Sequence, residues 1–268
     1  MTSHLYTIAA LQTFGSHISF PTDPLSGEQI LLRWVHIVAG IIWVGLLYFF
    51  NLVGMPAMKQ LEPAVLEPAV RVKMYQVLMG RAMWWFRWSA VFTVLAGLRY
   101  YSELLGIDAQ NAGMPSLAWK WFGWWALVWL TAYALIYPLQ MPSKGALNNS
   151  WVHNRWVRAV AIAAIVIAAS LIVLRLNSDP QASNAHLSIS LGGGLGLLML
   201  LNTWGVVWRV QKKLIAWTRA TAEQEAPMPA EAERLARWSF LASRVGFWLS
   251  FPMLFFMAAA EHFPFLGG

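Results

Sequence analysis

Long apolar runs separated by shorter polar segments form the main pattern of this chain. The clearest run, Leu31 to Gly54 (LLRWVHIVAGIIWVGLLYFFNLVG), is apolar enough and long enough to cross a bilayer, which needs about 20 residues. We therefore expect an all-α integral membrane protein, with a single transmembrane domain over residues 30–268 and an arm over residues 1–29. The six predicted spans are about 30–54, 83–105, 117–138, 156–175, 186–208 and 237–260.

The polar segments between these runs differ in basic charge. Segments 55–82, 139–155 and 209–237 hold most of the Lys and Arg residues, whereas the segments on the other side of the bundle hold almost none. Because Lys and Arg concentrate in cytoplasmic loops, both termini are predicted to face the periplasm, with the spans in a bacterial inner (cytoplasmic) membrane. We expect a polar connection with a surface helix in 55–82, and a helical extension over 209–222.

Composition supports the membrane assignment and limits the chemistry. The 268 residues are 58% hydrophobic and only 12% charged, against about 25% charged in a typical soluble domain. The 17 tryptophans suit the bilayer–water interface. The net charge of +7 comes from loops between apolar runs, so we expect a lipid bilayer and no nucleic acid as partner. The absence of cysteine excludes disulfides, Cys-ligated clusters and covalent c-type haem.

Histidines provide the candidate chemistry. His36 lies inside the first run, where an ionisable side chain is costly and therefore a functional-site candidate. Gly40 follows one turn later on the same helical face and leaves room for a flat cofactor or for another helix. His186 opens the fifth run and has Gly193 on its face, while His262 closes the sixth. All three histidines are expected on the periplasmic side.

Two histidines on different helices, each beside small residues, match what axial ligation of a porphyrin requires. We therefore predict haem b with its iron on His36 and His186, and with His262 as an alternative ligand or supporting group. Three alternatives remain open: the glycines after His186 only allow close helix packing, His262 is an interfacial residue, or a zinc or copper ion binds. No His-x-x-x-His motif or carboxylate-supported pair occurs to favour a metal ion.

Three stretches resemble the membrane domain of the bacterial urate hydroxylase (membrane urate oxidase) family. They are RWVHIVAGIIWVGLLYFFNL at 33–52, HLSISLGGGLGLLMLLNTWGVVWRVQKK at 186–213 and WLSFPMLFFMAAAEHFP at 248–264. In that family a helical membrane domain precedes a periplasmic c-type cytochrome domain, and the resemblance places the same three histidines on motif positions. More distantly, the first span is similar to the copper-resistance-D and membrane protoporphyrinogen oxidase proteins.

Two departures from the family affect the functional prediction. The sequence has no CxxCH, and Val245-Gly246 stand where the family tends to show His-Asn. We therefore predict a haem b redox protein that passes electrons to or from a separate periplasmic c-type cytochrome, as a subunit of a larger redox complex. One alternative is an enzyme, a membrane urate or purine oxidase. The other is a cofactor-free structural subunit of a respiratory or photosynthetic membrane complex.

Overall fold

The computed structural model of the chain describes residues 23–60, 68–141 and 154–266, and every regular element within them is a helix. Six helical stretches are long and apolar enough to cross a membrane, which confirms the predicted all-α membrane bundle. The elements are α2 (Pro24–Tyr48), η1 (Phe49–Gly54), α3 (Met55–Gln60), α4 (Pro68–Asn111), α5 (Leu117–Gln140), α7 (Arg155–Asn177), α8 (Asn184–Asn202), η3 (Thr203–Trp208), α9 (Arg209–Gln224) and α10 (Ala232–Ala259).

The first helix starts earlier than the hydrophobic pattern predicted. Asp23 caps α2, because its carboxylate accepts a hydrogen bond of 2.8 Å from the Ser26 N–H, and Pro24 occupies the first turn. Hydrogen bonding from the Ser26 side chain, together with this backbone hydrogen bond, lowers the pKa of the Asp23 carboxyl. Residues 24–29 are thus helical rather than part of an arm, and residues 1–22 of the predicted arm lie outside the described part of the chain.

The second span is one continuous helix with a polar extension. α4 has 44 residues and is therefore about 66 Å long at 1.5 Å per residue, against roughly 30 Å of bilayer hydrocarbon. The polar connection predicted over 55–82 contains α3 and, over 68–82, the first turns of α4, which continue into the second span without a break. The predicted helical extension of the fifth span is confirmed, since α8, η3 and α9 follow without a break.

Two spans contain a π-helical segment, η1 in the first and η3 in the fifth. Such wide turns often mark functional positions in membrane and soluble helices. In η1 the buried Asn51 amide donates hydrogen bonds of 2.9 Å to the Leu47 carbonyl and to the Ser243 hydroxyl of α10. Asn51 therefore links the first span to the sixth by a side-chain hydrogen bond.

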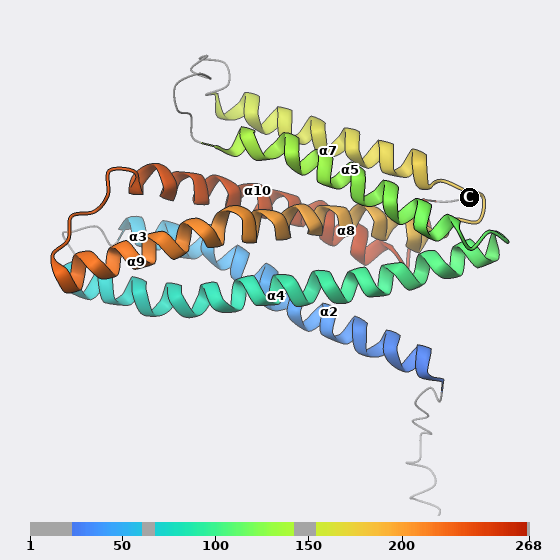
Figure 1. Cartoon of the computed structure of the whole chain (residues 1–268), viewed down its shortest axis with the longest axis horizontal. Coiled ribbons are helices and arrows are strands. Elements are labelled where there is room, and N and C mark those ends of the chain that lie inside the picture. The colour runs from blue at the N-terminus through green and yellow to red at the C-terminus, as the bar shows by residue number, and fades with distance from the viewer. Residues whose placement is uncertain (1–22, 61–67, 142–153, 267–268) are drawn as a thin grey trace, which may run out of the picture.

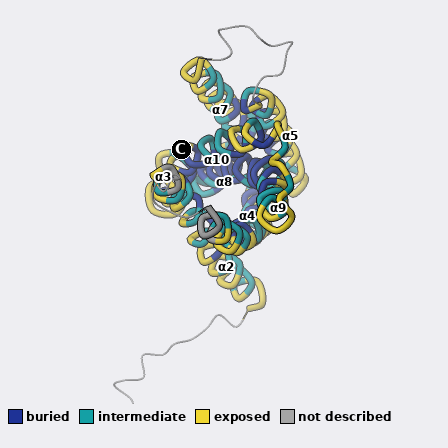
Figure 2. The backbone as a smooth tube through the Cα atoms, turned by 90° about the vertical axis from the view of Figure 1, so that its left-hand side faces the viewer, coloured by how far each residue is buried: buried dark blue, intermediate teal, exposed yellow. Residues whose placement is uncertain are grey.

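The helices form a bundle around α8, the most buried span (Figure 2). α5 and α7 pair along one side, and α2 crosses the bundle obliquely while packing against α4 (Figure 1). Both Trp125 and Trp129 of α5 donate an indole N–H to the Ser190 carbonyl of α8, at 2.8 and 3.2 Å. A Cβ on Gly194 would overlap the Trp129 ring. Close packing is therefore the role of Gly194.

Side chains of α2 contact α10 or the residues just after it at two levels. Arg33 forms an ion pair with Glu261, just beyond α10, and the hydroxyls of Tyr48 and Ser250 lie 3.0 Å apart. The start of α2 and the end of α10 therefore lie on the same side of the bundle, as an even number of crossings requires (Figure 1). The largest part of the α2 wall of the candidate site lies between these two contact points.

Candidate cofactor cavity

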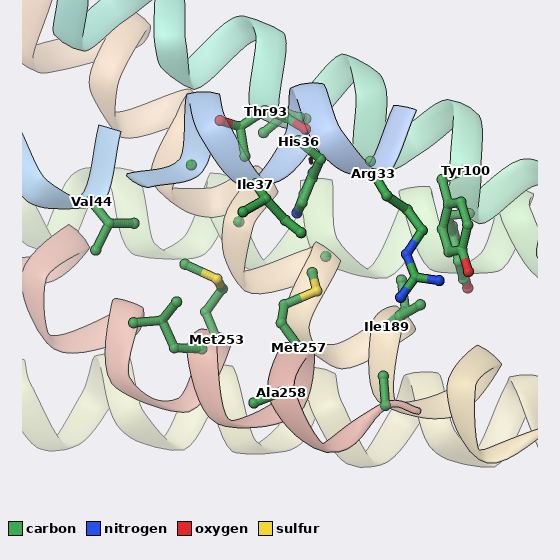
Figure 3. Close-up of a pocket in the computed structure, with 18 of the residues that line it drawn as sticks. Arg33, His36, Ile37, Val44, Thr93, Tyr100, Ile189, Met253, Met257 and Ala258 are labelled. Atoms are coloured by element: carbon green, nitrogen blue, oxygen red, sulfur yellow. Dashed lines mark hydrogen bonds between the residues drawn. The ribbon is translucent and has the colours of Figure 1, made fainter. Parts of the chain in front are cut away.

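A cavity of about 590 Å³ lies between α2, α4, α8 and α10 (Figure 3). Its walls are almost entirely apolar or aromatic side chains together with five glycines. Pockets of about 300–1,000 Å³ with apolar walls and few polar groups are typical sites for small organic ligands and cofactors. The cavity therefore has the size and lining of a cofactor site.

The cavity is open toward the bilayer between α2 and α10. Ile37, Ile41 and Leu254 line it, yet their exposed fractions are 56, 67 and 43%. All three residues lie within predicted membrane-spanning helices, so their exposed surface faces lipid rather than water. A hydrophobic ligand could therefore pass between the cavity and the membrane without crossing an aqueous phase.

His36 is a polar group on the α2 wall, and its orientation is fixed by α4. Its Nδ1 lies 2.8 Å from the Thr93 carbonyl oxygen. A carbonyl only accepts hydrogen bonds, so Nδ1 carries the proton and the neutral ring keeps a lone pair on Nε2. Figure 3 shows the ring pointing from α2 into the cavity. Histidines that bind metal usually donate their other ring N–H in this way, to a backbone carbonyl or a carboxylate.

A second glycine, which the sequence analysis did not identify, allows His36 to lie against α4. A Cβ built on Gly97 would be 2.9 Å from both Nδ1 and Cε1 of the imidazole, closer than side chains normally approach. The predicted Gly40 is less constrained, because a Cβ there would lie 3.6 Å from the Thr93 methyl group, an ordinary van der Waals contact. Nothing in the sequence distinguished Gly97 from Gly80 and Gly106 of the same helix, since the partner of Gly97 is on another helix.

Polar residues gather at the mouth of the cavity. The Arg33 guanidinium lies 2.6 Å from a Glu261 carboxylate oxygen, and the Tyr100 hydroxyl donates to the other oxygen at 3.1 Å. The guanidinium also lies 5.8 Å from the centre of the Tyr100 ring. His262 lies at this rim and is exposed. The mouth therefore offers one cation, one carboxylate and one imidazole at the expected periplasmic side.

His186 is placed differently from the other predicted histidines. It is fully buried, its Nδ1 lies 3.2 Å from an Asp108 carboxylate oxygen, and its ring packs on Trp121 at 4.9 Å between centres. The same carboxylate oxygen accepts hydrogen bonds of 2.9 Å from the Ser183 N–H and hydroxyl. Tyr101, which does line the cavity, packs on the His186 ring at 6.1 Å.

The cavity thus brings together four of the five predicted site residues, namely His36, Gly40, Gly193 and His262. His186 is not among the lining residues, because the chain buries it beside Asp108 instead. This arrangement does not support His186 as the partner of His36 on one iron. Asp108 lies outside the predicted spans and had no predicted role, and the structure places it near the end of α4.

The side chains available for binding a metal are few. Over residues 23–60, 68–141 and 154–266, no three His, Asp or Glu side chains come together as they would to hold a bare metal ion. Haem iron needs fewer ligands from the protein than a bare metal ion, because the protein supplies only the axial ligands. His36, with a free Nε2 in an apolar cavity, can supply one of them.

Comparison of the chain with protein-family models, with curated proteins and with solved structures found no match in any of the three. The functional assignment therefore rests on the cavity and its residues.

Proposed function

We propose that this multi-pass membrane protein binds haem b in the cavity and exchanges electrons with a separate periplasmic c-type cytochrome. The observation that carries the proposal is His36, whose Nδ1 is held by the Thr93 carbonyl and whose Nε2 is directed into a large apolar cavity. Haem supplies reversible one-electron chemistry, and the apolar walls keep water from its iron.

The remaining lining fits the same cofactor. Cβ atoms on Gly45 and Gly196 would meet nothing within 4 Å, so these positions leave open space for a flat ring. A haem also carries two anionic propionates, and the exposed Arg33 at the mouth is the cation that would pair with one of them in place of Glu261. The macrocycle would then lie among apolar side chains with its charged edge toward the aqueous side.

A visible absorption spectrum tests haem binding. The purified protein should show a b-type α-band in the reduced-minus-oxidised spectrum, and His36→Ala should lose it because the axial nitrogen is removed. His262→Ala is the matched control, since this exposed histidine lies at the rim. A wild-type protein without an α-band after haem reconstitution would refute the proposal and favour a cofactor-free structural subunit.

The cytochrome partner is tested by kinetics. The cavity mouth lies on the side that the Lys and Arg distribution predicts to be periplasmic. Reduced haem-loaded protein mixed with an oxidised soluble c-type cytochrome should transfer electrons in a haem-dependent reaction. Co-purification without any cytochrome or redox subunit, together with no transfer in this assay, would contradict the proposed role.

A membrane urate or purine oxidase is the second candidate, and the polar mouth favours it. Arg33, Glu261 and Tyr100 could contact a polar heterocycle there. The cavity itself is less suitable, because a purine presents several hydrogen-bonding groups that apolar walls would leave unpaired, at a cost of about 1–3 kcal/mol each. Urate oxidation by the haem-loaded protein with a cytochrome acceptor would establish this activity, and no turnover would exclude it.

A further inference from the structure

Haem iron has two axial positions, and the two walls of the cavity can each supply one ligand. His36 belongs to the wall formed by α2 and α4. The opposite wall is formed by α8 and α10, and the lining residues that these two helices contribute are aliphatic apart from the thioethers of Met253 and Met257. A thioether sulfur is an established axial ligand of haem iron, and methionine paired with histidine raises the reduction potential.

The contacts between α2 and α10 place Met257 at the depth of His36. The Arg33–Glu261 ion pair brings these two positions to the same level at the mouth. The two helices run in opposite directions. His36, three residues after Arg33, lies one turn inward along α2, and Met257, four residues before Glu261, lies one turn inward along α10. Met253 lies one further turn inward along α10.

The surroundings of Met257 also leave its sulfur free to bind iron. A Cβ on Gly192 would meet the Met257 Cγ and Cε atoms at 3.2 Å, so the side chain lies close over the α8 backbone. It is only partly buried, and Figure 3 shows it reaching from α10 toward the cavity, on the wall opposite His36. A methionine side chain has three rotatable bonds and adapts easily to a neighbouring group.

The other candidate ligands are less suitable. His262 follows the end of α10 and is exposed at the rim, one turn or more outward from the level of His36. His186 does not line the cavity and faces Asp108. Met253 is buried and lies deeper than His36.

We propose that Met257 is the second axial ligand of the haem iron, opposite His36, an inference that rests on the proposed haem binding. The coordination is then histidine–methionine rather than bis-histidine. It gives a six-coordinate, low-spin haem with a higher potential than two histidines would provide. Such a centre is suited to accept electrons rather than to bind oxygen, because neither face of the iron is vacant.

Ligand identity can be read from spectra of the haem-loaded full-length protein. The ferric wild type should be low-spin and show the near-infrared sulfur-to-iron charge-transfer band in magnetic circular dichroism. Met257→Leu should lose this band and become high-spin while retaining haem, and its reduction potential should fall. Leucine conserves most of the volume, so the fold should be kept. Met257→His should restore the low-spin state without the sulfur band and at a lower potential than wild type.

Two further variants complete the test. Met199→Leu is the matched control, because Met199 is a buried methionine of α8 that does not line this cavity. Met253→Leu tests the neighbouring sulfur and should keep the band. Loss of the band in Met253→Leu but not in Met257→Leu would overturn the assignment of Met257, as would an unchanged low-spin spectrum in Met257→Leu. A wild type that binds no haem would overturn the proposed function and this inference together.

Discussion

Gly97 determines how closely His36 can approach α4, so it should be as sensitive to substitution as the histidine itself. In Gly97→Ala the new Cβ would lie 2.9 Å from the imidazole, which must move and weaken its hydrogen bond to Thr93. We expect the dissociation constant for haem to rise about tenfold or more, which corresponds to a loss of about 1.4 kcal/mol of binding free energy. Haem titration measures the change.

Gly106→Ala in the same helix is the control, because its Cβ would meet nothing within 4 Å. Alanine generally favours a helix over glycine by roughly 0.5–1 kcal/mol, so neither variant should unfold the protein. Equal haem affinity in both variants would show that the contact between Gly97 and His36 is unimportant.

Asp108 should be required for stability rather than for cofactor binding. It accepts two hydrogen bonds from Ser183 and lies 3.2 Å from Nδ1 of the buried His186. Asp108→Ala would leave the two Ser183 donors without their acceptor and remove the carboxylate beside His186, so we expect the free energy of unfolding to fall by roughly 2–4 kcal/mol. Thermal unfolding in detergent measures it. Asp179→Ala is the control, because it removes only one exposed hydrogen bond from the Gln181 N–H. It should lower the free energy of unfolding by about 1 kcal/mol or less.

At the scale of helices, the hydrophobic pattern predicted the number and order of the spans but not which helix faces touch. The pattern shows how apolar a segment is, but it does not distinguish residues that face lipid from residues that face another helix. His36 could therefore be selected by its depth in a span. Thr93 and Gly97 could not, because their importance comes from the rotation of α4 against α2. The pairing of His186 with Asp108 could not be predicted for the same reason, since Asp108 belongs to another helix.

Packing of α5 on α8 gives a prediction at this scale. A Cβ on Gly194 would overlap the Trp129 indole, which is fully buried. Gly194→Ala should therefore force α5 and α8 apart. We expect the free energy of unfolding to fall by about 1–3 kcal/mol, as it does when a buried core is overpacked. Circular dichroism melts compare it with Gly123→Ala in α5, where a Cβ would meet nothing within 4 Å. A melting temperature for Gly194→Ala at or above that of Gly123→Ala would contradict this packing.

At the scale of the whole molecule, the opening between α2 and α10 is the expected route for a hydrophobic ligand. The sequence contains no cysteine, so Arg33→Cys with Glu261→Cys introduces the only two thiols. Joining them with a short bis-maleimide would prevent α2 from moving away from α10. We expect the cross-linked apoprotein to take up haem several-fold more slowly than the uncross-linked variant.

The pair Arg219→Cys with Glu223→Cys is the matched control, because it replaces an exposed ion pair within α9, away from the cavity. Cross-linking there should leave the uptake rate unchanged. An equal rate for both cross-linked proteins would mean that haem does not enter between α2 and α10.

The ion pair at the mouth joins residues 228 positions apart in the chain. A ribosome must therefore translate nearly all of the described chain before α10 can meet α2, whereas α2 and α4 can pair much earlier. The cavity has no closing wall during most of membrane insertion, so its ligand can be captured only after the last span has left the translocon. Nascent chains arrested before α10 should consequently remain colourless even in cells with abundant haem.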